Sequence, residues 1–123
     1  MAQRFSEPLF VISVAARLVE MHPQTLRKYE REGLIAPSRT SGNLRLYSDQ
    51  DIERLRQVKY LVEERGMNLA GVQMALDLTR ELLALRERLD IEDPQTRVIH
   101  KQMSKMLAML GHIDQDAIRQ QGR

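Results

Sequence analysis

Basic and amide side chains gather in the short stretch from His22 to Glu32. Arginine presents a planar fork of donors that fits guanine or phosphate, and glutamine can form two hydrogen bonds with adenine. Gln24, Arg27 and Lys28 therefore indicate chemistry suited to base edges and phosphates. The same side chains would also suit an ordinary solvated helix face, with Tyr29 as an anchor in the core.

The residues around this stretch predict a short helix. Pro23 fits the first helical turn because its missing N–H costs nothing there. His22 is a candidate N-cap, which is a more ordinary role for it than that of a pH switch or ligand. Gly33 is typical of a helix end.

A small hairpin is predicted directly after this helix. Ser41-Gly42-Asn43 predicts a tight turn, and the alternation in Leu44-Arg45-Leu46-Tyr47 predicts a strand. Arg39 and Arg45 flank the turn, so we expect their guanidinium groups near the hairpin tip. A helix with one basic face followed by a basic hairpin is the pattern of a recognition helix and a wing.

The neighbouring segments supply the helices that would support this pair. Ser13 is the predicted N-cap of a helix over 14–20, and a turn over 21–24 joins it to the helix over 25–31. Two short helices with a tight turn between them predict a helix-turn-helix. Further along, the predicted helix caps are Ser48 and Asn68, and the candidates for additional phosphate contacts are Arg54, Arg56 and Lys59.

Apolar residues change their spacing in the last third of the chain, where they step by four and three. This is the spacing of a heptad seam. The seam is interrupted at Pro94, where the helices either kink or fold back as a hairpin. We expect a coiled-coil-like dimerisation segment, with seam residues Leu78, Leu82, Leu85, Leu89, Ile99, Met103, Met106 and Leu110.

Composition excludes several classes of function. The chain has 123 residues, 42% of them hydrophobic and 29% charged, with a net charge of +2 and no cysteine. The missing cysteines exclude disulfides, thiolate metal sites and thiol redox sensing. No apolar run approaches the length of a membrane span, and no signal peptide is apparent, so we expect a cytoplasmic protein. No catalytic constellation or cofactor motif is present, and we expect neither an enzyme nor a cofactor.

Four segments carry a resemblance to a known family: HPQTLRKY at 22–29, EREGLI at 30–35, RTSGNLRLYS at 39–48 and NLAGV at 68–72. They resemble the winged-helix transcriptional regulators of the MerR family. Within that family, ISVAA at 12–16 followed by MHPQTLRKYE at 21–30 is most similar to heat-shock repressors of the HspR type.

The resemblance implies a mainly α fold, a winged helix-turn-helix followed by dimerisation helices. Together with the heptad spacing, it predicts an arm (1–9), a DNA-binding domain (10–77), a helical dimerisation or effector segment (78–119) broken near Pro94, and a tail (120–123). It also implies that Gln24, Thr25 and Lys28 face the groove and that Arg27 and Tyr29 contact the DNA backbone. In the wing, it implies DNA contacts by Arg39 and Arg45, with Tyr47 half in the core and half on phosphate.

The implied function is repression of heat-shock (chaperone) genes by a homodimer that binds an inverted repeat of double-stranded DNA, with a DnaK-type chaperone as corepressor. Two alternatives stay open at this point. One is a regulator of another circuit, similar to the glutamine synthetase repressors. The other is a chaperone-modulator protein that binds a J-domain partner instead of DNA, against which the basic wing argues.

Overall fold

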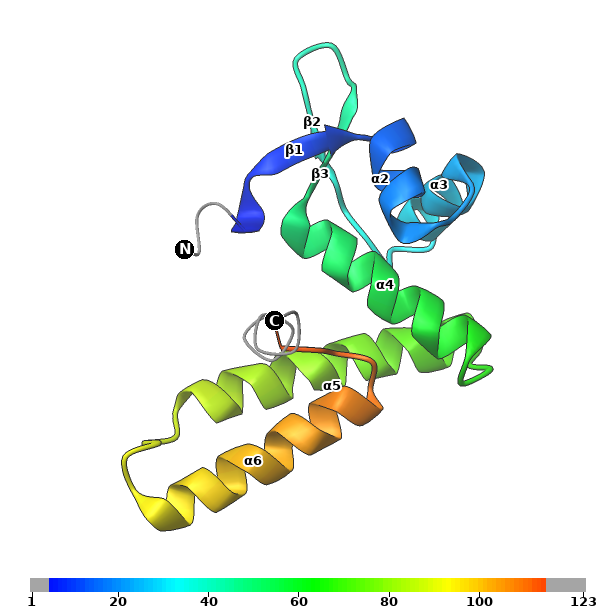
Figure 1. The fold of residues 1–123 in the computed structure, drawn as a ribbon. Helices are drawn as coiled ribbons and strands as arrows, with labels where there is room; N and C mark the ends of the chain where they lie inside the picture. The colour runs from blue at the N-terminus through cyan, green and yellow to red at the C-terminus, as the bar shows by residue number, and fades with distance from the viewer. Residues whose placement is uncertain (1–4, 115–123) are drawn as a thin grey trace. The chain divides into compact units, whose positions relative to one another are not determined.

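The computed structural model describes residues 5–114. In that part of the chain, five helices accompany a small three-stranded sheet (Figure 1), which confirms the predicted mainly α class. The chain forms two compact units, residues 1–60 and 61–123, and each is described by itself. The expected tail at 120–123 lies outside the described residues, as do 1–4 of the expected arm and 115–119 of the expected helical segment.

The sheet of the first unit is antiparallel and has β3 (Arg45–Ser48) as its middle strand. β1 (Pro8–Val11) pairs with one edge of β3 and β2 (Ser38–Arg39) with the other. The strand β1 was not predicted, and Pro8 and Leu9 were expected in the arm. They belong to a strand because they pair with β3. β3 comes much later in the chain, so the sequence near Pro8 does not reveal this pairing.

The predicted helix-turn-helix is present as α2 (Ile12–Val19) and α3 (Pro23–Arg31). The prediction that Ser13 caps the first helix was wrong. β1 runs directly into α2, so Val11 takes the cap position, without a side-chain hydrogen bond, and Ser13 already lies in the first turn.

α4 (Asp49–Glu63) begins with the predicted cap. The Asp51 amide donates to Ser48 Oγ at 3.0 Å, and the Ser48 amide donates to Asp51 Oδ2 at 2.9 Å. This reciprocal pair satisfies two backbone donors at the helix start. Leu55 and Val58 of the same helix are fully buried and belong to an aliphatic core in the first unit.

The second unit contains α5 (Leu69–Glu87) and α6 (Pro94–Met109), which fold back on each other as a hairpin (Figure 1). Of the two geometries left open at Pro94, the structure therefore has the fold-back. The Asp93 carboxylate accepts from the Gln95 amide at 3.0 Å, so Pro94 starts a new helix rather than kinking an old one. Asn68 caps α5 as predicted, accepting from the Gly71 amide at 2.8 Å.

An ion pair ties the segment after α6 to α5. Arg86 donates to both carboxylate oxygens of Asp114, at 2.8 and 2.9 Å, and to Ser104 Oγ at 2.7 Å. The Arg86 hydrogen bonds lower the pKa of the Asp114 carboxyl. A bidentate arginine–carboxylate pair has a fixed geometry, so it holds the hairpin in register.

Candidate nucleic-acid interface

α3 is anchored by one apolar face. Leu26 is fully buried and Tyr29 is 7% exposed. His22 Nδ1 accepts from the Gln24 amide at 3.0 Å, which confirms the predicted N-cap. At the other end Gly33 has a φ of 78°, a left-handed conformation that glycine adopts without strain. Burial of a leucine and a tyrosine on a nine-residue helix fixes which of its faces points outward.

The outward face carries the side chains expected to contact DNA. Gln24 and Lys28 are exposed, and Thr25 and Arg27 are partly exposed. At 100° per residue, Gln24, Arg27 and Lys28 lie within a sector of about 100°, opposite the buried Leu26. Such a face can present donors to base edges and phosphates together.

Arg31 shares this sector and was missed as a candidate. It lies three residues after Lys28 and seven after Gln24, and it is exposed. The helical spacing alone could have identified it. Tyr29, in contrast, was expected to contact the DNA backbone, but its side chain lies on the buried face of α3.

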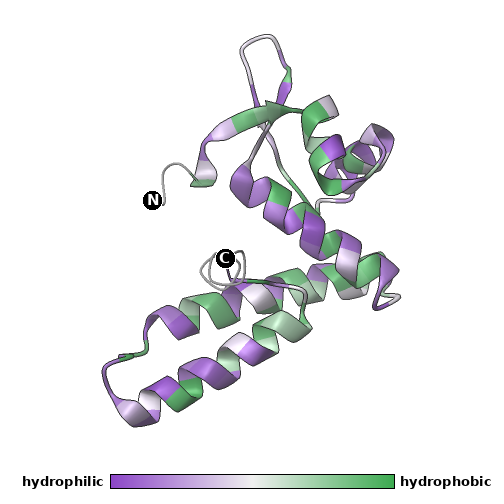
Figure 2. Ribbon diagram, viewed as in Figure 1, coloured by the Kyte–Doolittle hydropathy of each residue, from purple (hydrophilic) through white to green (hydrophobic). Residues whose placement is uncertain are grey.

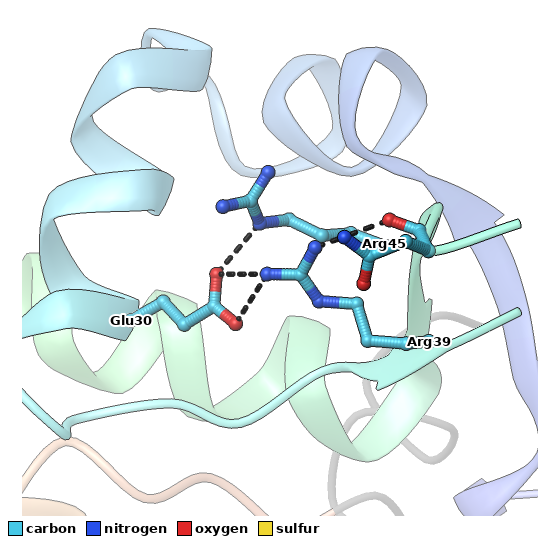
Figure 3. Close-up of polar contacts among 4 residues, drawn as sticks. Glu30, Arg39 and Arg45 are labelled. Atoms are coloured by element: carbon cyan, nitrogen blue, oxygen red, sulfur yellow. Dashed lines mark hydrogen bonds and ion pairs between the residues drawn. The ribbon is translucent and has the colours of Figure 1, made fainter.

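Both wing arginines contact α3, and Arg39 also contacts the turn beside which the sequence placed it. Arg45 Nε donates to Glu30 Oε1 at 2.6 Å (Figure 3). Arg39 Nη2 donates to Glu30 Oε2 at 3.0 Å and to Oε1 at 3.3 Å. Arg39 Nη1 also donates to the Asn43 carbonyl at 3.2 Å, which ties the turn to the same group. One carboxylate therefore links the recognition helix to both strands of the wing.

The carboxylate of Glu30 is held in its charged form. Partial burial would raise the pKa of Glu30, but hydrogen bonds and charge from Arg45 and Arg39 outweigh that effect and lower the pKa below its ordinary value. Glu30 was not among the predicted site residues. Its partners lie nine and fifteen residues further along the chain, so no local pattern reveals them.

Tyr47 is fully buried, although half of its side chain was expected to contact phosphate. Burial raises the pKa of its hydroxyl, which has no hydrogen-bond partner among the described residues. Phe10 of β1 is its partner in the sheet, and the side chain belongs to the core of the first unit.

The basic residues of α4 donate to backbone carbonyls of the first unit, and Arg56 is also exposed. Arg54 Nε donates to the Leu34 carbonyl at 2.6 Å, and Arg56 donates to the Leu18 carbonyl at 3.3 Å. Lys59 Nζ donates to the carbonyls of Val19 and Glu20 at 3.2 and 3.1 Å. The last carbonyls of α2 have no partners within that helix, so Arg56 and Lys59 cap it. The phosphate contacts expected from all three residues stay a prediction.

The expected seam residues differ in burial, and three of them, Leu82, Leu89 and Leu110, are half-buried. Met103 is buried, on the side of α6 that carries Ser104 and faces α5. Leu78, Leu85, Ile99 and Met106 are between 41% and 52% exposed. Figure 2 shows hydrophobic residues alternating with polar ones along both helices. On α5, Leu78 and Leu85 follow Met74 on the face opposite the buried Val72 and Leu76, which leaves an apolar stripe facing outward.

The described residues contain no group of three or more histidines and carboxylates that could hold a metal ion. Within the same range, no helix is both long enough and apolar enough to cross a membrane.

Comparison with known proteins gives a consistent family. Residues 10–79 match the model of the MerR HTH family regulatory protein. The chain is 51% identical over 81 residues to a candidate heat shock protein HspR of Streptomyces coelicolor, covering 66% of this chain and 54% of that protein. It is 30% identical over 118 residues to the HTH-type transcriptional regulator GlnR of Bacillus anthracis, covering 95% and 91% of the two chains.

A solved structure supports the same assignment. The transcription regulator PbrR691 of Ralstonia metallidurans CH34, determined in complex with lead(II), superposes with a TM-score of 0.53 at 25% identity. The match covers 82% of this chain and 80% of that one. The chain spans only about half the length of the HspR relative. The match therefore does not assign the whole activity of that protein to this chain.

Proposed function

The chain belongs to the MerR family of helix-turn-helix regulatory proteins, and from that premise we propose that it is a repressor of heat-shock (chaperone) genes. The 51% identity over 81 residues to the HspR relative supports this circuit. In this proposal a DnaK-type chaperone acts as corepressor. When unfolded protein occupies the chaperone, repression is relieved.

The observation that carries DNA binding is the outward face of α3. Gln24, Lys28 and Arg31 are exposed there, beside the partly exposed Arg27, while the opposite face is buried. We propose that this face enters the major groove, with Arg45 of the wing on the flanking phosphate. Tyr29 and Tyr47 anchor α3 and the wing in the core, and Arg39 holds the wing turn through its hydrogen bond to Asn43.

We further propose a homodimer that binds an inverted repeat. The outward stripe of Leu78 and Leu85 on α5, with the half-buried Leu82 beside it, is the proposed contact between two copies. A twofold pair of recognition helices reads two half-sites of opposite orientation.

A regulator similar to GlnR is the second candidate, and one observation favours it. That match extends over 95% of the chain and thus into the C-terminal helices, whereas the HspR match covers 66%. The C-terminal helices are the part expected to receive the effector. A chaperone-modulator role without DNA binding has less support, because the basic face of α3 would then have no purpose.

The test is selection of bound duplexes from a random library, followed by affinity measurements on the selected site. Arg27→Ala should weaken binding by roughly 10- to 100-fold, the range expected for one base-contacting arginine. Arg97→Ala removes the same charge from an exposed position on α6 and serves as the matched control. Equal losses in both variants would contradict the assignment of α3.

The circuit is tested separately by footprinting the chaperone promoter with and without added chaperone. Stronger protection in the presence of the chaperone supports the heat-shock proposal. Protection that responds to glutamine synthetase and not to the chaperone would favour the second candidate.

A further inference from the structure

Glu30 engages the two wing arginines through different parts of their guanidinium groups. Arg45 contacts it by Nε alone, and in Figure 3 its two terminal nitrogens point away from the carboxylate. Neither terminal nitrogen has a hydrogen bond among the described residues. Arg39 contacts it by Nη2, while its Nη1 bonds the Asn43 carbonyl. The two arginines therefore present different numbers of unused donors.

A carboxylate and a DNA phosphate compete for the same donors, because both accept the parallel N–H groups of arginine. The terminal edge of Arg45 is available to a phosphate while its Nε contact to Glu30 stays in place. Arg39 would have to leave Glu30 or the turn carbonyl in order to bind a phosphate through its terminal nitrogens.

Resting on the proposed function, we propose that Glu30 is a positioning residue that aligns Arg45 for one DNA phosphate and keeps Arg39 off the DNA. Arg39 then braces the wing turn against α3. The contact between Glu30 and Arg45 increases the preference for one DNA site, because an arginine held in one orientation fits the DNA backbone in only one register. Two unrestrained arginines would bind the phosphates of any duplex.

The salt dependence of DNA binding measures this division of roles. Each phosphate contact contributes about 0.9 to the slope of log affinity against log salt. For each half-site, Arg45→Ala should reduce the slope by about one, and Arg39→Ala should leave it unchanged. Glu30→Gln should release Arg39, raise the slope by about one per half-site and increase affinity for unrelated duplex by several-fold. Adding Arg39→Ala to Glu30→Gln should remove that gain.

Glu32→Gln is the matched control, since Glu32 is an exposed carboxylate at the end of the same helix and the change in charge is identical. It should leave the slope and the preference for the selected site unchanged. If Glu30→Gln fails to fold, judged by thermal unfolding, the comparison of Arg39→Ala with Arg45→Ala still decides the question.

The outcomes separate the two proposals. A wild-type protein that binds no duplex overturns the proposed function and this inference with it. A wild-type protein that binds its site, with equal slope changes for Arg39→Ala and Arg45→Ala, overturns only the inference. Equal salt slopes and equal affinities for unrelated duplex in Glu30→Gln and Glu32→Gln would also overturn only the inference.

Discussion

Replacing Leu78 and Leu85 by alanine should dissociate the proposed dimer without unfolding the subunit. These leucines are 47% and 51% exposed on the outward side of α5. The core of the second unit relies instead on buried residues such as Leu76 and Leu107, which the substitutions leave intact.

The size of the effect follows from the exposed area. Full burial of a leucine side chain is worth about 2 kcal/mol, so covering the exposed half is worth about 1 kcal/mol. A twofold interface contains each leucine twice, which gives about 4 kcal/mol for the double variant. At about 1.4 kcal/mol per tenfold, the dimer dissociation constant should rise by roughly a thousandfold.

Sedimentation equilibrium over a range of protein concentrations would measure this constant, with thermal unfolding as the check on folding. The double variant Val98→Ala/Met109→Ala is the control, because both residues are exposed apolar positions on α6 outside the proposed stripe. A shift of less than tenfold for the leucine pair would refute the assignment of this stripe. An equal shift for the control pair would do the same.

Three further predictions concern stability. Tyr47→Phe should leave the free energy of unfolding unchanged or raise it by up to about 1 kcal/mol, because the lost hydroxyl has no partner among the described residues; urea unfolding that shows a clear loss would contradict this. Arg86 lowers the pKa of Asp114, so the pair stabilises the fold above the unfolded-state pKa of about 3.9 and loses that effect as pH falls through the lower folded-state pKa. Asp114→Asn should accordingly cost stability near pH 7 and progressively less on acidification, and a cost that is independent of pH would count against the pair. Lys59→Met should lower the melting temperature, because the carbonyls at the end of α2 lose their cap, while DNA affinity stays unchanged; a parallel loss of affinity would assign Lys59 to the interface.

Local sequence signals were sufficient for the elements that carry the candidate site. His22 and Pro23 start α3, and Ser48 and Asn68 cap α4 and α5 as predicted. Each of these signals acts between residues at most three apart. The apolar positions Leu26 and Tyr29 likewise define the buried face of α3, which sets its exposed face by helical geometry alone.

Contacts between distant segments could not be predicted in the same way. β1 exists because Val11 pairs with Leu46, and its own residues carry no strong strand signal beside Pro8. Pro94 suits both a kink and a helix start, and the Arg86–Asp114 pair supports the fold-back. The contact that both wing arginines make with Glu30 was not predicted, because Glu30 belongs to the preceding helix.

The central claim, that the exposed basic face of α3 holds duplex DNA, is tested most directly by titrating salt against affinity for the selected inverted repeat. The account predicts two chains per duplex and an affinity that falls steeply between about 50 and 200 mM salt, in proportion to the number of phosphates contacted. Affinity that does not change over this range would contradict the claim. So would the absence of binding to any duplex at the lowest salt with the chaperone present.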